Sequence, residues 1–240
     1  MSNQYFQFKQ FIIHQDRCAM KVSTDSCLFG AWLSKTIIPS LPKITHALDI
    51  GAGTGLLMLM MAQEHSFSID GIELDEGAYQ QASSNIEATS WKDQLQLFHG
   101  DVNDFEFSQQ YDLIVSNPPF YEKDLMPLSS VKASAKHEAT LNFEELIKLA
   151  AHHLKSVGYV AFLLPYHRFD HVRQLAINNG FSIHNVVHVR HQHDHDFIRS
   201  MILLGRKPVE AIIESIIIKE EDRSYTAAFE GLLRDYYLHL

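Results

Sequence analysis

Short apolar runs alternate with longer amphipathic segments through the middle of the chain. The runs have the length and composition of strands, and the segments between them repeat apolar residues at helical spacing. Strands that are apolar throughout and separated by helices are typical of a parallel sheet covered on both faces. The predicted strands are Ala47–Ile50, Ser68–Ile72, Gln94–Phe98, Tyr111–Val115 and Gly158–Leu164, and the predicted helices are Leu56–Gln63, Glu76–Ala88 and Phe143–Leu154.

The pattern continues differently after Pro165. It predicts a helix that ends at Asn178, a turn, and two further strands, Ile183–Val189 and Ile198–Leu204. The polar stretch RHQHDHD between these strands is typical of a hairpin loop, so we expect an antiparallel strand at or near the edge of the sheet. The predicted fold is therefore α/β, a doubly wound, mostly parallel, seven-stranded sheet whose last core strand is antiparallel.

No repeat, low-complexity tract or Gly/Ser-rich linker marks a boundary between domains in the 240 residues. We expect one unit with a core over residues 45–207. Residues 1–44 would form an N-terminal extension packed on this core, and residues 208–240 would add a strand and a helix to the same domain.

Composition narrows the functional class. Hydrophobic residues make up 46% of the chain and charged residues 20%, which is ordinary for a globular protein. No apolar run approaches the roughly 20 residues that span a bilayer, and the N-terminus lacks the layout of a secretory signal. We expect a cytoplasmic protein with no membrane partner, in which Cys18 and Cys27 are reduced thiols.

The net charge of −9 argues against general affinity for nucleic acid, because phosphate binding depends on Lys and Arg. Residues 166–207 are the exception, with six Lys and Arg against three Asp. This segment is the candidate phosphate-facing patch, although a solvated surface without a partner would have the same composition.

Asp49–Leu57 reads DIGAGTGLL and lies between a predicted strand and a predicted helix. Glycines let the backbone approach a ligand closely, and the helix N-terminus behind them supplies free N–H groups. The spacing of Gly51, Gly53 and Gly55 is GxGxG, one residue shorter than the dinucleotide fingerprint GxGxxG. With Asp49 before it, this loop is of the S-adenosyl-L-methionine type, in which the acid meets the ammonium group of the methionine.

Three more polar residues stand at the ends of the next predicted strands. Glu73 lies 20 residues beyond Gly53, where a carboxylate can accept both ribose hydroxyls. Asp101 can accept from the adenine amino group while Val102 offers its backbone N–H, and Asn117 ends the following strand. A helix-start charge and a helix N-cap are the alternatives for Glu73 and Asp101. Polar groups at four successive strand ends together predict one cofactor site.

Asn117 begins the sequence NPPF. Proline fixes φ and cannot donate to a sheet ladder, so Pro118 and Pro119 end the strand and hold the Asn117 amide rigidly. An immobile amide beside the ring of Phe120 suits a flat substrate that carries an amino group.

DIGAGTG together with NPPF resembles the class I methyltransferases that act on exocyclic or planar nitrogens, which share a Rossmann-like fold. The resemblance implies that Asn117 and the carbonyl of Pro118 accept hydrogen bonds from the target amine while Phe120 stacks on the base. Accepting both protons favours a pyramidal nitrogen and aims its lone pair at the methyl group. Direct displacement of this kind needs no metal.

Five segments extend the resemblance over nearly the whole chain. FKQF, HQDRCAMKVSTDSCLFGAW, DIGAGTGLL, NPPFY and YTAAFEGLLRDYYL are similar in order and spacing to the bacterial tRNA1(Val) (adenine(37)-N6)-methyltransferases. This implies transfer of a methyl group from S-adenosyl-L-methionine to N6 of adenine 37 in the anticodon loop of valine tRNA. It also implies that three residues lie beside the methionine end of the cofactor: Lys21, Thr24 and Asp25.

The candidate RNA face combines the basic segment with the long loop that follows NPPF. Its predicted contacts are Lys132, Lys136, Arg168, Arg190 and Arg199. His191, His193 and His195 alternate and would share one face of an extended chain, as metal ligands, as a pH-dependent RNA contact or as an idle loop. We expect no metal.

Other functions fit part of the pattern. NPP motifs also serve in methyltransferases of protein glutamine amides. DNA adenine methylation is disfavoured because no target-recognition domain is present. A non-catalytic RNA chaperone that binds S-adenosyl-L-methionine would have no need of the amine-orienting NPPF.

Overall fold

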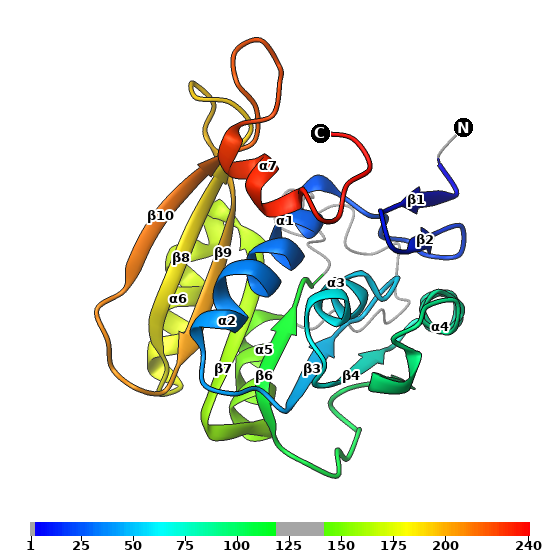
Figure 1. Cartoon of the computed structure of the whole chain (residues 1–240). Coiled ribbons are helices and arrows are strands. Elements are labelled where there is room, and N and C mark those ends of the chain that lie inside the picture. The colour runs from blue at the N-terminus through cyan, green and yellow to red at the C-terminus, as the bar shows by residue number, and fades with distance from the viewer. Residues whose placement is uncertain (1–2, 119–141) are drawn as a thin grey trace, which may run out of the picture.

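A mostly parallel sheet forms the centre of the computed structural model, which describes residues 3–118 and 142–240 (Figure 1). Its eight strands follow the order β10-β8-β9-β7-β6-β3-β4-β5. Their bounds are β3 His46–Ile50, β4 Ser68–Glu73, β5 Leu95–His99, β6 Tyr111–Ser116, β7 Leu154–Pro165, β8 Ser182–Arg190, β9 Phe197–Gly205 and β10 Ile212–Ile217.

The predicted α/β sheet is confirmed. The seven predicted strands correspond to β3–β9, and β9 is antiparallel to both β7 and β8, between which it is inserted. The sheet is one strand wider than predicted, because β10 in the C-terminal segment pairs in parallel with β8. Both Ile212 and Ile213 of β10 are exposed, so this strand lacks the alternation that would have marked it as part of the main sheet.

Helices cover both faces of the sheet. The strands alternate between two cores: Leu113 and Val115 of β6 face α1, α3 and α7, whereas Ile114 faces α5 and α6. The helices are α1 Thr24–Trp32, α2 Ile38–Ser40, α3 Leu56–Glu64, α4 Glu76–Glu87, α5 Phe143–His153, α6 Phe169–Asn178 and α7 Ala227–Leu233, with a π-helical turn at Leu33–Ile37.

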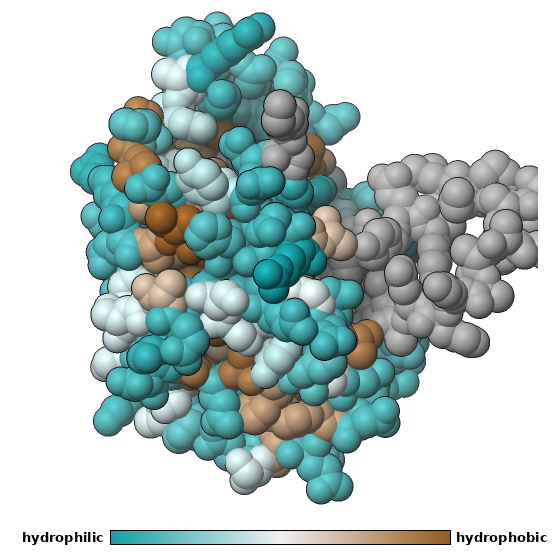
Figure 2. All heavy atoms as spheres, turned by 90° about the vertical axis from the view of Figure 1, so that its right-hand side faces the viewer, coloured by the Kyte–Doolittle hydropathy of each residue, from teal (hydrophilic) through white to brown (hydrophobic). Residues whose placement is uncertain are grey.

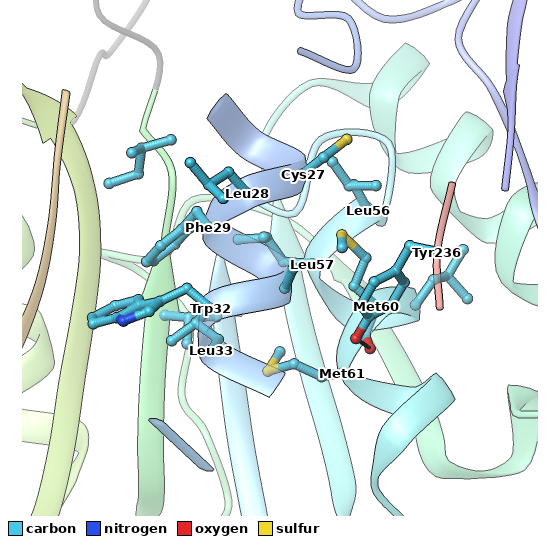
Figure 3. Packing of buried hydrophobic residues seen from close by; sticks show 14 of the residues in the cluster. Cys27, Leu28, Phe29, Trp32, Leu33, Leu56, Leu57, Met60, Met61 and Tyr236 are labelled. Atoms are coloured by element: carbon cyan, nitrogen blue, oxygen red, sulfur yellow. Dashed lines mark hydrogen bonds between the residues drawn. The ribbon is translucent and has the colours of Figure 1, made fainter. Parts of the chain in front are cut away.

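α1 and α3 pack against each other over almost their whole length. A Cβ atom on Gly30 of α1 would lie 3.3 Å from Leu57 Cδ2 of α3, which shows how closely the two helices approach. Figure 3 shows Cys27 of α1 near Leu56 of α3, and Tyr236 from the C-terminal segment beside Met60. The Tyr236 hydroxyl donates to the Met60 carbonyl at 3.0 Å, which satisfies the one polar atom of a fully buried ring. Both ends of the chain therefore contribute to the core under α1 and α3.

The N-terminal residues form a two-stranded hairpin, β1 Tyr5–Gln7 and β2 Ile12–His14. Asn85 of α4 holds this hairpin. Its Oδ1 accepts from the His14 N–H at 2.9 Å, and its Nδ2 donates to the carbonyls of His14 and Thr54, both at 3.0 Å. Because Thr54 lies in the loop between β3 and α3, one buried amide ties the hairpin and that loop to the same helix.

The outer surface around α4 and the hairpin is mostly polar. Figure 2 shows this face, with apolar side chains in small separate groups among hydrophilic ones. Among the described residues, no helix has the length and apolar character needed to cross a membrane.

We expect Asn85→Ala to lower the free energy of unfolding by about 2 kcal/mol, because it leaves the buried Thr54 carbonyl and the partly buried backbone groups of His14 without partners. Urea denaturation followed by circular dichroism measures this. Gln80→Ala, an exposed amide on the same helix, is the matched control and should change stability by less than about 0.5 kcal/mol. Equal effects of the two substitutions would contradict the role given to Asn85.

Candidate active site at the carboxyl edge of the sheet

The loops after β3, β4, β5 and β6 leave the same edge of the sheet, because these strands are parallel neighbours. Asp49 pairs in register with Gly71 of β4 and with Val115 of β6. One step further, the Ser116 hydroxyl donates to the Ile50 carbonyl at 2.7 Å. This buried bond fixes the start of the glycine loop beside the start of NPPF.

A pocket opens where these loops meet the segment before α1. It brings together five predicted site residues from three parts of the chain: Lys21, then Asp49, Gly51 and Gly53 of the glycine loop, and Asn117. The other lining residues are Met20, Val22, Ser26, Ala52, Thr54, Leu56 and Leu57. A wider hollow between residues 103–110 and the end of α5 contains none of the predicted site residues.

The glycine loop has a backbone that needs glycine. Gly51, Gly53 and Gly55 have φ values of 76°, 57° and 80°, in the left-handed region that other residues rarely adopt. A Cβ atom built on Gly51 would meet nothing within 4 Å, so the space beside this backbone is open to a ligand. Gly55 is the N-cap of α3, and the loop therefore delivers the helix N-terminus to the pocket.

Asp49 is the decisive residue of the pocket. Its side chain is 1% exposed, and neither carboxylate oxygen has a hydrogen-bond partner within the described residues. Burial, followed by the negative charge of Glu73, raises the pKa of Asp49 from 3.8 to about 8. A buried carboxylate without a partner is costly unless a ligand provides a cation, which the ammonium group of a methionine moiety does.

Glu73 lies at the end of β4, as predicted, and also clamps the glycine loop. One carboxylate oxygen accepts from the Gly53 N–H at 2.7 Å and the other from the Asp75 N–H at 2.9 Å. Each oxygen of a carboxylate can accept two hydrogen bonds, so both retain capacity for a pair of hydroxyls. The hydrogen bond from the Gly53 N–H to Glu73 was not predicted, because a bond between a side chain and the backbone 20 residues away leaves no pattern in the sequence.

Asp101 and Val102 follow β5 in a tight turn. Asp101 Oδ1 accepts from the backbone and side-chain amides of Asn103, both at 2.9 Å, and the Val102 side chain is buried. Neither residue lines the pocket with Asp49. No helix follows Asp101, so the alternative of a helix N-cap does not apply, and its contact with adenine stays a prediction.

NPPF lies only partly within the described residues. Asn117 is half-buried and lines the pocket, and Pro118 is buried directly behind it. Phe120 lies outside the described residues, as do Lys132 and Lys136. The structure thus places Asn117 in the pocket, whereas the rigid hold on its amide and the stacking role of Phe120 stay predictions.

The segment around the start of α1 contributes one residue to the pocket and another to an ion pair. Lys21 lines the pocket, and Thr24 is the first residue of α1. The Asp25 carboxylate accepts from Arg199 Nε at 2.7 Å and from the Ser26 N–H at 3.2 Å. Asp25 was predicted beside the cofactor and Arg199 on the RNA face; the structure joins the two residues to each other, and both roles stay predictions.

The remaining basic residues of the predicted RNA face lie at this edge too. Arg168 follows β7, and Arg190 ends β8 with its guanidinium over the Phe197 ring, 4.0 Å from the ring centre. Within the described part of the chain, no group of three His, Cys, Asp or Glu residues could hold a metal ion, and this includes the histidine-rich hairpin loop.

Several lining residues were missed by sequence reasoning. Ser26 and Thr54 contribute to the pocket, and both stand inside segments that had been singled out for other residues. Met20 and Val22 flank Lys21 and supply an apolar wall. Their proximity to the glycine loop depends on how the N-terminal segment folds back, which local sequence does not indicate.

The comparisons with known proteins agree with this geometry. Residues 32–193 match the methyltransferase small domain family. A tRNA1(Val) (adenine(37)-N6)-methyltransferase from Cytophaga hutchinsonii is 39% identical, with all of both chains covered. Another from Pectobacterium carotovorum is 37% identical over 98% of this chain and 94% of its own. The chain belongs to the tRNA1(Val) (adenine(37)-N6)-methyltransferase family.

Solved structures show the same fold at much lower identity. A predicted O-methyltransferase from Agrobacterium tumefaciens superposes with a TM-score of 0.67 at 14% identity, over 88% of this chain and 96% of that one. TYW2 from Pyrococcus horikoshii, in complex with MeSAdo, gives 0.61 at 14% identity, over 85% and 71%. The class I methyltransferase fold and the resemblance seen in the motifs are confirmed.

Family and fold imply S-adenosyl-L-methionine as the cofactor, and the residues present fit it. Asp49 offers an unpartnered buried carboxylate to the ammonium group, and Gly51 leaves open space along the backbone. Glu73 stands at the next strand end with free acceptor capacity for the ribose.

We expect Asp49→Asn to stabilise the ligand-free protein at about pH 8 by about 1–3 kcal/mol. The pKa of Asp49 is raised in the folded state to about 8, so its contribution to stability is present below its ordinary pKa of 3.8 and is lost as pH rises toward 8. The free energy of unfolding, measured at several pH values between about 5 and 8, should fall less steeply with rising pH in the variant than in the wild type. Parallel curves would contradict the buried, unpartnered carboxylate.

Proposed function

We propose that this chain is a tRNA methyltransferase that transfers a methyl group from S-adenosyl-L-methionine to N6 of adenine 37 in the anticodon loop of tRNA1(Val). The observation that carries the proposal is the pocket in which the unpartnered Asp49 carboxylate and the Asn117 amide lie together. A cation-seeking carboxylate and an amine-orienting amide in one pocket suit a sulfonium donor and an amine acceptor. The full-length similarity to enzymes named for this reaction supports the choice of substrate.

The cofactor would be held by residues from three strand ends and from the N-terminal segment. Asp49 binds the ammonium group, the Gly51–Gly55 backbone lies against the methionine and ribose, and Lys21 and Thr24 approach from the N-terminal segment. Glu73 accepts from the ribose hydroxyls, and Asp101 with the Val102 N–H receives the adenine. When bound, S-adenosyl-L-methionine supplies an electrophilic methyl group on a cationic sulfur.

Asn117 and the Pro118 carbonyl would orient the acceptor. The lone pair of an aromatic amine is delocalised, and two acceptors aimed at its protons favour a pyramidal nitrogen whose lone pair points at the methyl group. The methylated nitrogen is cationic and strongly acidic, so its proton passes to water without a dedicated base. Phe120 would stack on the adenine ring.

A base in an anticodon loop suits this site because it can be splayed out of its stack and enter a pocket. Arg168 and Arg190 of segment 166–207 lie toward the same edge and would face the phosphates, whereas Arg206 and Lys207 follow the antiparallel strand β9 at the opposite edge. We also propose that residues 45–207 form the catalytic core, with 1–44 and 208–240 as extensions of the same domain.

Nucleosides from tRNA of a strain that lacks this protein test the function directly. Mass spectrometry of purified valine tRNA should show loss of N6-methyladenosine, and the purified protein should restore it in vitro on deproteinised tRNA. Unchanged N6-methyladenosine in that tRNA would overturn the proposal. Methylation of a protein glutamine with no activity on deproteinised tRNA would favour the glutamine methyltransferase instead.

We expect Asn117→Ala to lower kcat by about 10²–10³-fold, the usual effect of losing one aligned hydrogen bond that acts in the transition state. Affinity for S-adenosyl-L-methionine, measured by calorimetry, should stay within about tenfold of the wild type. Asn178→Ala, an exposed amide on α6, is the control and should have full activity. Full activity of Asn117→Ala would exclude Asn117 from the reaction.

A further inference from the structure

A group of aromatic side chains lies at the site edge of the sheet, outside the pocket. Tyr166 follows β7, His188 is near the end of β8, and Phe197 begins β9. The Tyr166 ring centre is 5.0 Å from that of His188 and 5.1 Å from that of Phe197, and Phe169 of α6 is 5.0 Å from His188. We call Tyr166, Phe169, His188 and Phe197 the aromatic platform.

The platform is held rigidly but is not covered. His188 Nδ1 is 2.9 Å from the Ser200 hydroxyl, and burial lowers the pKa of His188, which disfavours the charged form of its ring. Tyr166 meets His188 edge-on, with their ring planes at 87°, and is 39% exposed. A ring that is in contact with other rings and still partly exposed can offer its remaining surface to a base.

A positive charge is built into the platform. The Arg190 guanidinium lies 4.0 Å from the Phe197 ring centre and donates from Nη1 to the His193 carbonyl at 2.9 Å. Its Nε is buried and has no hydrogen-bond partner within the described residues. The platform thus pairs aromatic faces with a fixed cation, in a basic segment of an otherwise acidic chain. This combination is typical of proteins that bind single-stranded nucleic acid.

The platform is close to the acceptor position. In the sheet order, β7 separates β6, which Asn117 follows, from β9, which begins at Phe197. The register pairs Ser116 with Phe162 and Pro165 with Arg199, so Phe197 lies further along the strands than Asn117. Two strand spacings and this stagger separate the two residues by roughly 16 Å. The Asp25–Arg199 ion pair links β9 to the start of α1, next to the pocket residue Ser26.

We propose that the aromatic platform binds the base of a nucleotide adjacent to the target adenine, by stacking on Tyr166, while Arg190 faces the neighbouring phosphate. This inference rests on the proposed function, because it assigns a second nucleotide of the same anticodon loop. A base that is flipped into the pocket leaves its neighbour unstacked, and the platform replaces the lost stacking partner. The platform acts on tRNA binding, and the methyl transfer itself does not involve it.

Steady-state kinetics with valine tRNA test the platform. Tyr166→Ala should raise KM for tRNA about tenfold, the order expected for one lost base–aromatic stack, with kcat and the affinity for S-adenosyl-L-methionine within about twofold of the wild type. Tyr166→Phe keeps the ring and should restore the wild-type KM. Tyr5→Ala removes another exposed tyrosine, on the N-terminal hairpin, and should have no effect.

A second measurement identifies the partner of Tyr166. Full-length valine tRNA is assembled with an abasic nucleotide on the 5′ or the 3′ side of the target adenine. With one of these tRNAs, the KM of the wild type should be about tenfold higher than with intact tRNA. The KM of Tyr166→Ala should change little, because the abasic nucleotide and the substitution remove the same contact.

Two results would overturn the inference. One is an unchanged KM in Tyr166→Ala. The other is that, for both abasic tRNAs, the fold-increase in KM caused by the abasic nucleotide is the same in Tyr166→Ala as in the wild type. Failure of the proposed function has a different signature. In that case the wild-type protein transfers no methyl group to intact tRNA, and the inference falls with it.

Discussion

The central strand β3 determines where everything else in the site lies. It pairs in parallel on both sides, and the carbonyl of its last residue, Ile50, accepts from the Ser116 hydroxyl. The chain therefore leaves the sheet at Gly51 with the ends of β4 and β6 fixed alongside. Cofactor-binding and amine-orienting groups meet because parallel strands end at a common edge, and no long-range recognition between the loops is needed.

Several groups of the site lower the stability of the folded protein. Asp49 is kept buried and unpartnered, three glycines hold left-handed conformations, and the Glu73 carboxylate lies close enough to raise the pKa of Asp49. Contacts elsewhere compensate: Glu73 clamps the Gly53 amide, and Asn85 secures Thr54 together with the N-terminal hairpin. Such strain and burial in one loop, supported from outside it, is a common property of functional sites.

Features that depend on neighbouring residues could be predicted from the sequence, and features that depend on distant residues could not. The strands β3 to β9 and the helices between them follow from periodicity, and Asp49, Glu73 and Asn117 follow from their places at strand ends. The Asp25–Arg199 ion pair joins residues 174 positions apart, and the bonds of Asn85 reach across 71 and 31 positions. Composition and spacing carry no trace of such contacts. A strand was predicted in the C-terminal segment, but its place in the main sheet was not, because Ile212 and Ile213 are exposed and the pairing of β10 with β8 is decided by tertiary packing.

The contact between the two ends of the chain has a consequence for biosynthesis. Phe8 forms a β-bridge with Tyr237, and the Lys9 N–H donates to the Tyr236 carbonyl at 2.8 Å. The contacts of Phe8 and Lys9 can therefore form only after residues 236 and 237 have been translated. Contacts of such wide sequence separation slow folding and leave apolar surface exposed on the nascent chain. A ribosome paused before residue 236 would carry a polypeptide in which all the central strands are complete and Phe8 and Lys9 still lack these partners.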